Sequence, residues 1–202
     1  MNKESIHSVN ISIPKIDGTG LVLGRPAYTE DLAPQDALVV RLLRSSHAHA
    51  RILSIDTSAA LQIEGIACIL TWKDVKRIAY TRAGQGHPEP SPHDKFILDE
   101  YVRYVGDEVA IVAGRDLACV NRALSLIKVE YEVLPAVLDF EQAVDNPAVV
   151  HPESDIHEMF PIGFEPKRNI AAAYSMEVGN VAQVLEDCDV VVEGTWYTQA
   201  QN

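Results

Sequence analysis

The sequence is poor in cysteine and in long apolar runs, and its first residues are not expected to be a secretory signal. Its three cysteines, Cys68, Cys119 and Cys188, are widely separated, so no CxxC-type zinc or iron-sulfur motif is present. The longest apolar runs, such as residues 66–70, are far shorter than the ~18 residues that a membrane-spanning helix needs. The N-terminus has neither the basic nor the apolar part of a secretory signal. We therefore expect a cytoplasmic protein with buried, reduced thiols and no membrane crossing.

Basic residues are also scarce. The chain of 202 residues has 17 Lys and Arg against 29 Asp and Glu, a net charge of −12. The excess lies in residues 102–202, which contain 6 basic and 17 acidic residues. Proteins bind nucleic acid by neutralising phosphates with Lys and Arg, so nucleic acid is not expected as a partner. The hydrophobic content of 47% is sufficient for a globular core of one or two domains.

The first two thirds of the chain alternate strand and helix signals. β-rich runs predict strands at 37–44, 51–56, 66–71, 108–114 and 128–133, after an extended arm over 1–36. Thr57 and Asp116 are candidate N-caps of two helices, which run to about residues 63 and 127. Residues 80–95 are rich in Gly and Pro and predict a long loop. The strand, helix, strand order over 108–133 suggests α/β layer packing.

A second unit is predicted after a proline-rich, acidic linker. We expect a strand at 171–177, a helix capped by Asn180, and a strand at 189–198 that alternates Val190, Val192 and Trp196 with Val191 and Tyr197. No turn signal follows this last strand, which is typical of a chain cut within a domain. An unpaired aromatic strand of this kind predicts self-association.

The histidines give no complete metal site. His47 and His49 are two residues apart, so a strand would place both on one face as two metal ligands, but no third ligand is positioned and a structural role is favoured. The other four candidates are expected on the solvated surface, in the proline-rich loop or the acidic linker: His87, His93, His151 and His157.

No catalytic motif is recognisable either. The clusters Gly18-Thr-Gly20 and Gly84-Gln-Gly86 lack the frame of a phosphate-binding loop. The carboxylate pairs Asp107-Glu108 and Asp187/Asp189 could act as acid and base, but a solvated face is the favoured interpretation. No nucleophile and base pair supports a small hydrolase. From the residues alone we predict no catalytic residue and no metal ligand.

Three stretches carry a family resemblance: 43–74, 104–137 and 169–195. In order and spacing they resemble the N-terminal α/β-hammerhead domain of the large molybdenum subunit in the xanthine dehydrogenase and aldehyde oxidase family. The resemblance implies an α+β fold in which the hammerhead domain is followed by the first elements of the molybdopterin-binding domain. It divides the chain into an arm (1–19), the hammerhead domain (20–135), a linker (136–168) and a truncated start of the molybdopterin-binding domain (169–202).

The resemblance also implies a function for the whole enzyme. Such enzymes hydroxylate heteroaromatic, purine-like substrates or aldehydes with water as the oxygen source. They use molybdenum-molybdopterin, with 2Fe-2S clusters and FAD in partner domains or subunits. The cofactor loops and the catalytic glutamate of the family follow the region matched here, so this segment is expected to be structural and inactive by itself. Its expected partners are the rest of the molybdenum subunit, the iron-sulfur and FAD subunits or domains, and a second copy in a homo-oligomer.

One cofactor contact carries over by resemblance. Gln201 matches a family glutamine that hydrogen-bonds the molybdenum centre, and an ordinary polar strand end is the equally open alternative. The loop over residues 80–92 resembles that of xanthine or purine hydroxylases. The alternative for the whole chain is a free-standing hammerhead interaction module without redox activity.

Overall fold

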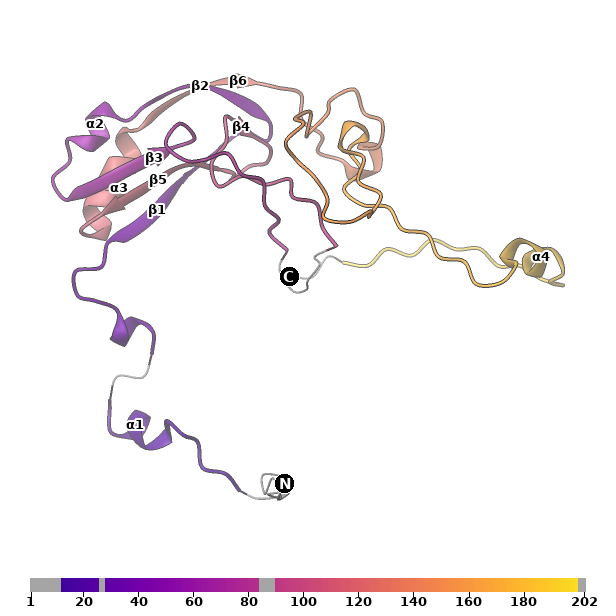
Figure 1. The fold of residues 1–202 in the computed structure, drawn as a ribbon, viewed down its shortest axis with the longest axis horizontal. Coiled ribbons are helices and arrows are strands. Elements are labelled where there is room, and N and C mark those ends of the chain that lie inside the picture. Colours follow the sequence, from indigo (N-terminus) through magenta and orange to yellow (C-terminus); the bar gives the residue numbers. More distant parts are fainter. Residues whose placement is uncertain (1–11, 26–27, 84–89, 200–202) are drawn as a thin grey trace. The chain divides into compact units, whose positions relative to one another are not determined.

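The computed structural model describes residues 12–25, 28–83 and 90–199 (Figure 1). Two compact units divide the chain: unit 1 comprises residues 1–76 and 98–133, and unit 2 comprises residues 77–97 and 134–202. Helices and antiparallel strands are mixed, which confirms the predicted α+β fold. Within the described ranges, the helices are too short or too polar to cross a membrane.

Unit 1 contains two three-stranded antiparallel sheets. The first has the order β1 (Val39–Arg44), β5 (Glu108–Gly114), β3 (Ile66–Thr71). The second has the order β4 (Tyr101–Val102), β2 (Ala50–Asp56), β6 (Lys128–Val133). The strands predicted in this part of the chain are present, and the two-residue strand β4 was not predicted.

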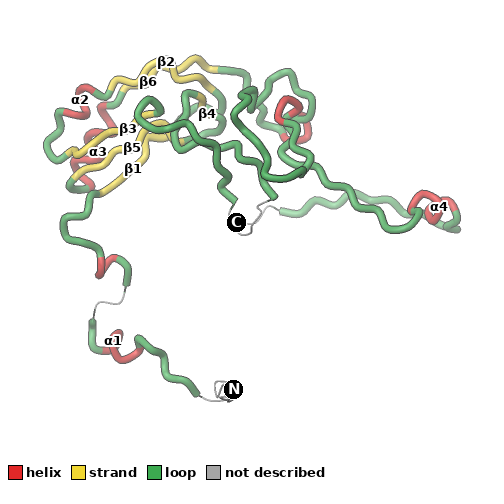
Figure 2. Tube along the Cα trace, in the orientation of Figure 1, coloured by secondary structure: helices red, strands yellow, loops and turns green. Residues whose placement is uncertain are grey.

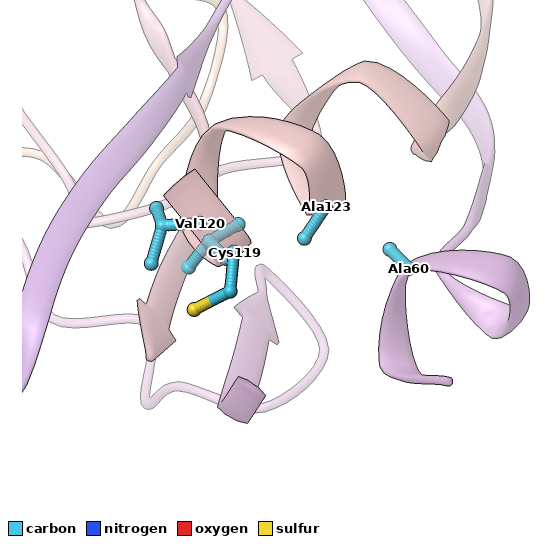
Figure 3. Packing of buried hydrophobic residues seen from close by; sticks show 5 residues of the cluster. Ala60, Cys119, Val120 and Ala123 are labelled. Atoms are coloured by element: carbon cyan, nitrogen blue, oxygen red, sulfur yellow. The ribbon is translucent and has the colours of Figure 1, made fainter. Parts of the chain in front are cut away.

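Two helices cover one face of the first sheet: α2 (Ser58–Leu61) and α3 (Leu117–Leu126). Asp116 caps α3 as predicted, because its carboxylate accepts a hydrogen bond of 2.8 Å from the backbone N–H of Cys119. Thr57 is the N-cap residue of α2 as predicted, but its side chain makes no capping bond, and the Asp56 carboxylate accepts from the N–H of Ser58 instead. In Figure 3, Ala60 of α2 and Ala123 of α3 lie in one buried cluster with Cys119 and Val120.

The opposite face of the first sheet meets the second sheet. Val109 of β5 packs in a second cluster with Ala50 and Ile52 of β2 and Val102 of β4. On the other face of the same strand, Val112 belongs to the helix cluster. Strand β5 is therefore buried on both faces and lies at the centre of a helix, sheet, sheet arrangement.

The α/β layer packing suggested for the strand, helix, strand segment is present, since α3 packs on the sheet that contains β5. The second strand of the segment, β6, lies in the other sheet. The predicted extended arm needs correction. Within the predicted extended arm, residues Gly18–Val22 form a short helix, α1, and Glu30–Leu32 a 3₁₀ turn, η1. A helix of a single turn does not need an apolar face that packs on a core. The spacing of apolar residues in the sequence therefore does not reveal it.

Unit 2 has little regular structure (Figure 2): the 3₁₀ helices η2 (Phe140–Gln142) and η3 (Pro166–Arg168), and helix α4 (Val181–Glu186). Hydrogen bonds from side chains connect the backbone segments of unit 2. The amide of Asn169 donates to the carbonyls of Ala143 and Ala148, each at 3.0 Å, and its oxygen accepts from the N–H of Val150 at 2.9 Å. Asn169 thereby joins the backbone of 143–150 to η3.

The strands predicted at 171–177 and 189–198 are wrong, because both segments lack strand structure in the described chain. Their alternating residues are exposed, and no neighbouring strand pairs with them. A strand is stabilised by its ladder partner, which the alternation alone does not supply. The predicted cap of α4 is confirmed, since the Asn180 side chain accepts from the N–H of Gln183 at 3.1 Å.

Hydrogen bonds hold the pKa of several aspartates below the usual range. The backbone N–H of Cys119 is the main cause at Asp116, and the guanidinium of Arg168 is the main cause at Asp145. A carboxylate whose pKa is lower in the folded chain stabilises the fold at pH values above its unfolded pKa of about 4. That contribution is lost as the pH falls through the folded pKa.

Acidification below about pH 4 should therefore lower the urea midpoint of the chain, because these carboxylates become protonated. The matched variant Asp116→Asn keeps a capping oxygen but does not titrate. It should lose less stability between about pH 5 and pH 2 than the unmodified chain, and the comparison cancels the general effect of net charge. Equal losses in the two proteins would contradict the role assigned to Asp116.

Candidate functional site

The cofactor contact predicted from resemblance, Gln201, lies outside the described residues. It stays a prediction. Of the remaining predicted site residues, His87 is also outside the described ranges, and the other histidines lie in both units.

His47 and His49 lie in the bend between β1 and β2 and not within a strand. The His47 backbone is fixed by Ser45, whose hydroxyl accepts from the His47 N–H and donates to the His47 carbonyl, each at 2.9 Å. The His47 ring packs edge-on against Tyr131, with 4.8 Å between ring centroids. These contacts fit a structural role for His47.

Three histidines of unit 2 have specific contacts. His93 and His157 form an antiparallel backbone bridge with N···O distances of 2.7 and 3.2 Å, and their rings lie 4.8 Å apart. His151 Nδ1 lies 2.8 Å from a carboxylate oxygen of Glu153. Across the described parts of the chain, no three His, Cys, Asp or Glu side chains gather in a way that could hold a metal ion.

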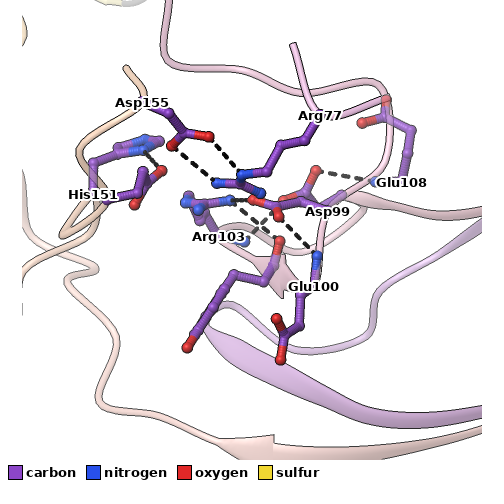
Figure 4. A network of polar contacts seen from close by, with 10 residues as sticks. Arg77, Asp99, Glu100, Arg103, Glu108, His151 and Asp155 are labelled. Carbon is purple, nitrogen blue, oxygen red and sulfur yellow. Dashed lines mark hydrogen bonds and ion pairs between the residues drawn. The ribbon is translucent and has the colours of Figure 1, made fainter. Parts of the chain in front are cut away.

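A buried polar cluster of unit 1 lies between Asp99 and Asp107. Arg103 Nη1 donates to Asp99 at 2.7 Å, and the two side chains are only 10% and 7% exposed. Asp107 is buried and accepts from the backbone N–H groups of Arg103 and Glu108. The expected solvated face at Asp107 is therefore wrong, and its bonds to backbone indicate a structural role. Figure 4 shows the contact of Arg103 with Asp99, and it also shows the ion pair of Arg77 with Asp155 in unit 2.

The thiols differ in exposure from the prediction. All three cysteines are free, but only Cys119 is buried, with its sulfur 3.1 Å from the Asp116 carbonyl oxygen. Cys68 is partly buried and Cys188 is exposed. The expectation of three buried thiols is wrong for Cys188, because the segment that contains it has no packed core.

Unit 2 contains an open groove of about 380 Å³. Most of its lining is apolar, and three polar side chains contribute: Asp94, His151 and Asn169. The remaining lining residues are Val137, Leu138, Phe140, Ala143, Val150, Phe164, Pro166, Ile170 and Ala171. We call this feature the unit 2 groove.

The walls of the unit 2 groove are fastened to one another. Besides the three bonds of Asn169, Arg168 donates to both carboxylate oxygens of Asp145 at 2.7 and 2.9 Å, and the Asp145 N–H donates to the Arg168 carbonyl. Sequence reasoning missed the groove because its lining residues are distant in the chain. The apolar residues Leu138 and Phe140, in a stretch otherwise predicted to be a linker, were the available signal.

The C-terminal segment, residues 171–199, exposes a dense set of large apolar side chains. Trp196 and Tyr197 are 81% and 87% exposed. The others are Tyr174, Met176, Val178, Val181, Val184, Leu185, Val190, Val191 and Val192. The segment has five acidic residues and no Lys or Arg. Exposed apolar surface of this extent is typical of a surface that another polypeptide covers.

Comparison with known proteins gives a consistent result. The family model described as "Aldehyde oxidase and xanthine dehydrogenase, a/b hammerhead domain" matches residues 23–135. The chain is 35% identical over 224 aligned residues to "Probable hypoxanthine oxidase XdhD" of Escherichia coli. This alignment covers 98% of the chain and 23% of that protein. It is 30% identical to the "Xanthine dehydrogenase molybdenum-binding subunit" of Escherichia coli, with 91% and 23% covered.

Solved structures agree. The aldehyde oxidoreductase of Desulfovibrio gigas superposes with a TM-score of 0.55 and 31% identity, over 70% of this chain and 16% of that one. The CO dehydrogenase of Oligotropha carboxidovorans gives a TM-score of 0.56 and 30% identity, over 67% and 16%. The chain thus spans less than a quarter of the length of these relatives.

Proposed function

The chain belongs to the aldehyde oxidase and xanthine dehydrogenase family, and we propose that it serves as the N-terminal structural segment of a molybdenum hydroxylase large subunit. The observation that carries the proposal is the match of the hammerhead model to residues 23–135, in a chain that aligns over 98% of its own length with 23% of a large relative. Unit 1 supplies the folded domain, and the exposed apolar C-terminal segment supplies surface for the remaining polypeptide.

The described residues do not fit the cofactors of such an enzyme. An iron-sulfur cluster needs four ligands, and the three cysteines of the chain are dispersed. Molybdopterin carries a phosphate, whereas the unit 2 groove is lined by apolar side chains and Asp94, without Lys or Arg. We therefore assign the molybdenum, 2Fe-2S and FAD chemistry to polypeptide outside these residues, and Gln201 stays the one proposed contact with the molybdenum centre.

The reaction proposed for the assembled cytoplasmic enzyme is hydroxylation of a purine-like heteroaromatic compound or an aldehyde, with water as the oxygen source. The purine class is supported by the similarity to a relative named as a probable hypoxanthine oxidase. The proposed partners are the rest of the large subunit, the iron-sulfur and FAD subunits or domains, and a second copy of the assembly.

A second candidate is an independent hammerhead interaction module. It is favoured by one observation: both core clusters of unit 1 are built entirely from residues between Val39 and Tyr131. The DNA sequence after the codon for Asn202 separates the two proposals. Continuation into a molybdopterin-binding region supports the structural segment, and a stop codon supports the module.

A chimera tests the structural role. In the E. coli relative named as a probable hypoxanthine oxidase, residues 1–202 of this chain would replace the matching segment. The chimera should retain substrate-dependent dye reduction with an unchanged order of substrate preference, because the segment provides no substrate contact. A chimera carrying Ile52→Asp should fail to accumulate, since the charge would be buried in the core. A folded, molybdenum-loaded chimera without turnover, or with altered substrate preference, would contradict the proposal.

A further inference from the structure

The unit 2 groove presents large apolar side chains on a fixed backbone. Leu138 and Phe140 line it and are 83% and 84% exposed. Phe140 begins η2, whose N-cap Asp139 accepts from the N–H of Glu141 at 3.0 Å and from the Gln142 side chain at 2.8 Å. Leu138 and Phe140 are therefore exposed on a stretch of backbone that hydrogen bonds hold in a defined turn.

A second part of the lining is also held by hydrogen bonds. It contains Pro166 and Asn169, and Asn169 is fixed by its three hydrogen bonds to residues 143–150. The bidentate pair of Arg168 with Asp145 ties the same two segments together. A groove with both parts of its lining fastened is largely preformed, which reduces the entropy cost of binding.

The segment that supplies most of the groove lining is acidic. Residues 134–171 contain two basic residues, Lys167 and Arg168, and seven acidic ones: Asp139, Glu141, Asp145, Glu153, Asp155, Glu158 and Glu165. The stretch that supplies Asp94 also contains one basic residue, Lys95. Arg168 is engaged with Asp145 and Glu165, and Asp94 adds a further carboxylate within the groove. Charge complementarity thus favours an occupant with Lys or Arg and disfavours a second copy of this acidic chain.

The openness of the groove distinguishes between classes of occupant. Sites for small molecules usually enclose 70–90% of the ligand surface. Here two of the largest apolar lining residues are themselves more than four-fifths exposed, so this part of the groove is more open than such a site. An open apolar surface of this kind fits an extended polypeptide segment, because the rest of the bound polypeptide can cover the exposed side chains.

We propose that the unit 2 groove binds a segment of a partner polypeptide that places a large apolar side chain against Leu138 and Phe140 and Lys or Arg residues near Asp94. The proposal rests on the geometry and charge of unit 2 and does not depend on the enzyme family. It adds a defined docking site, and the chemistry of its occupant, to the structural role proposed above.

Binding of synthetic peptides to the full chain tests the proposal by fluorescence anisotropy. The probe is a fluorescein-labelled peptide, Lys-Lys-Leu-Trp-Lys-Lys, compared with Glu-Glu-Leu-Trp-Glu-Glu and Lys-Lys-Ala-Ala-Lys-Lys. Only the first should bind. Phe140→Ser should weaken its binding about tenfold or more, because it removes the apolar anchor contact. Asp94→Asn should weaken it about two- to fivefold and reduce its salt dependence.

Leu53→Ser provides the matched control, since Leu53 is 56% exposed and lies in unit 1. It should leave the dissociation constant unchanged. Equal binding of all three peptides, no binding at millimolar concentration, or unchanged binding by Phe140→Ser would overturn the proposal. Sedimentation gives a further decisive result: a dimer that Phe140→Ser abolishes would identify a second copy as the occupant, against the proposal.

Discussion

Replacing Arg103 by methionine is expected to lower the free energy of unfolding by about 3–5 kcal/mol. Asp99 and Arg103 are 7% and 10% exposed and 2.7 Å apart, so the substitution removes a buried ion-pair partner of the Asp99 carboxylate. The same change removes the donor to the Tyr101 carbonyl in β4. Urea denaturation of the purified chain, followed by circular dichroism, measures the loss.

The matched control is Arg44→Met. Arg44 is 53% exposed and pairs with Glu108 at 3.4 Å, so its loss should cost less than about 1 kcal/mol. The double variant Asp99→Leu with Arg103→Met should recover part of the stability, because it removes both buried charges. Equal effects of Arg103→Met and Arg44→Met would show that burial of the Asp99 pair has no energetic consequence.

Replacing Ile52 by alanine is expected to cost about 2–5 kcal/mol. Ile52 is 2% exposed in the cluster that joins the two sheets of unit 1, and its removal leaves a cavity between β2, β4 and β5. Because both sheets share this cluster, the loss should appear as a lower urea midpoint for the whole of unit 1. Thermal unfolding by calorimetry provides the second measurement.

The adjacent residue gives the control. Leu53 is 56% exposed on the other face of the same strand, so Leu53→Ala should change stability by no more than about 0.5 kcal/mol. If Leu53→Ala were as destabilising as Ile52→Ala, the assignment of the buried face of β2 would be wrong.

Local signals predicted five of the six strands of unit 1 and its helices α2 and α3. Asp116 was identified as the cap of α3, and the apolar runs at 66–71 and 108–114 were identified as strands. The pairing was not predicted, because a strand, helix, strand order is compatible with either one parallel sheet or two antiparallel ones. Strand β4 escaped notice because two residues, Tyr101 and Val102, carry no periodicity.

The features of unit 2 depended on long-range contacts that the sequence pattern does not encode. Asn169 has an αL backbone and three tertiary hydrogen bonds, although it reads as an ordinary polar residue. The alternation of Val190, Val192 and Trp196 predicted a strand, but a strand also needs a partner. In unit 1, burial of Asp107 was missed because acceptance from two backbone N–H groups of its own loop leaves no signal in the sequence pattern.

We propose that this chain provides structure and docking surface to a redox enzyme whose reactive groups lie outside residues 1–202. The most direct test is the purified 202-residue chain by itself. Molybdenum would be measured by mass spectrometry, and turnover by dye reduction with xanthine, hypoxanthine and an aldehyde. We predict no bound molybdenum and no substrate-dependent dye reduction. Stoichiometric molybdenum with measurable turnover would contradict the claim.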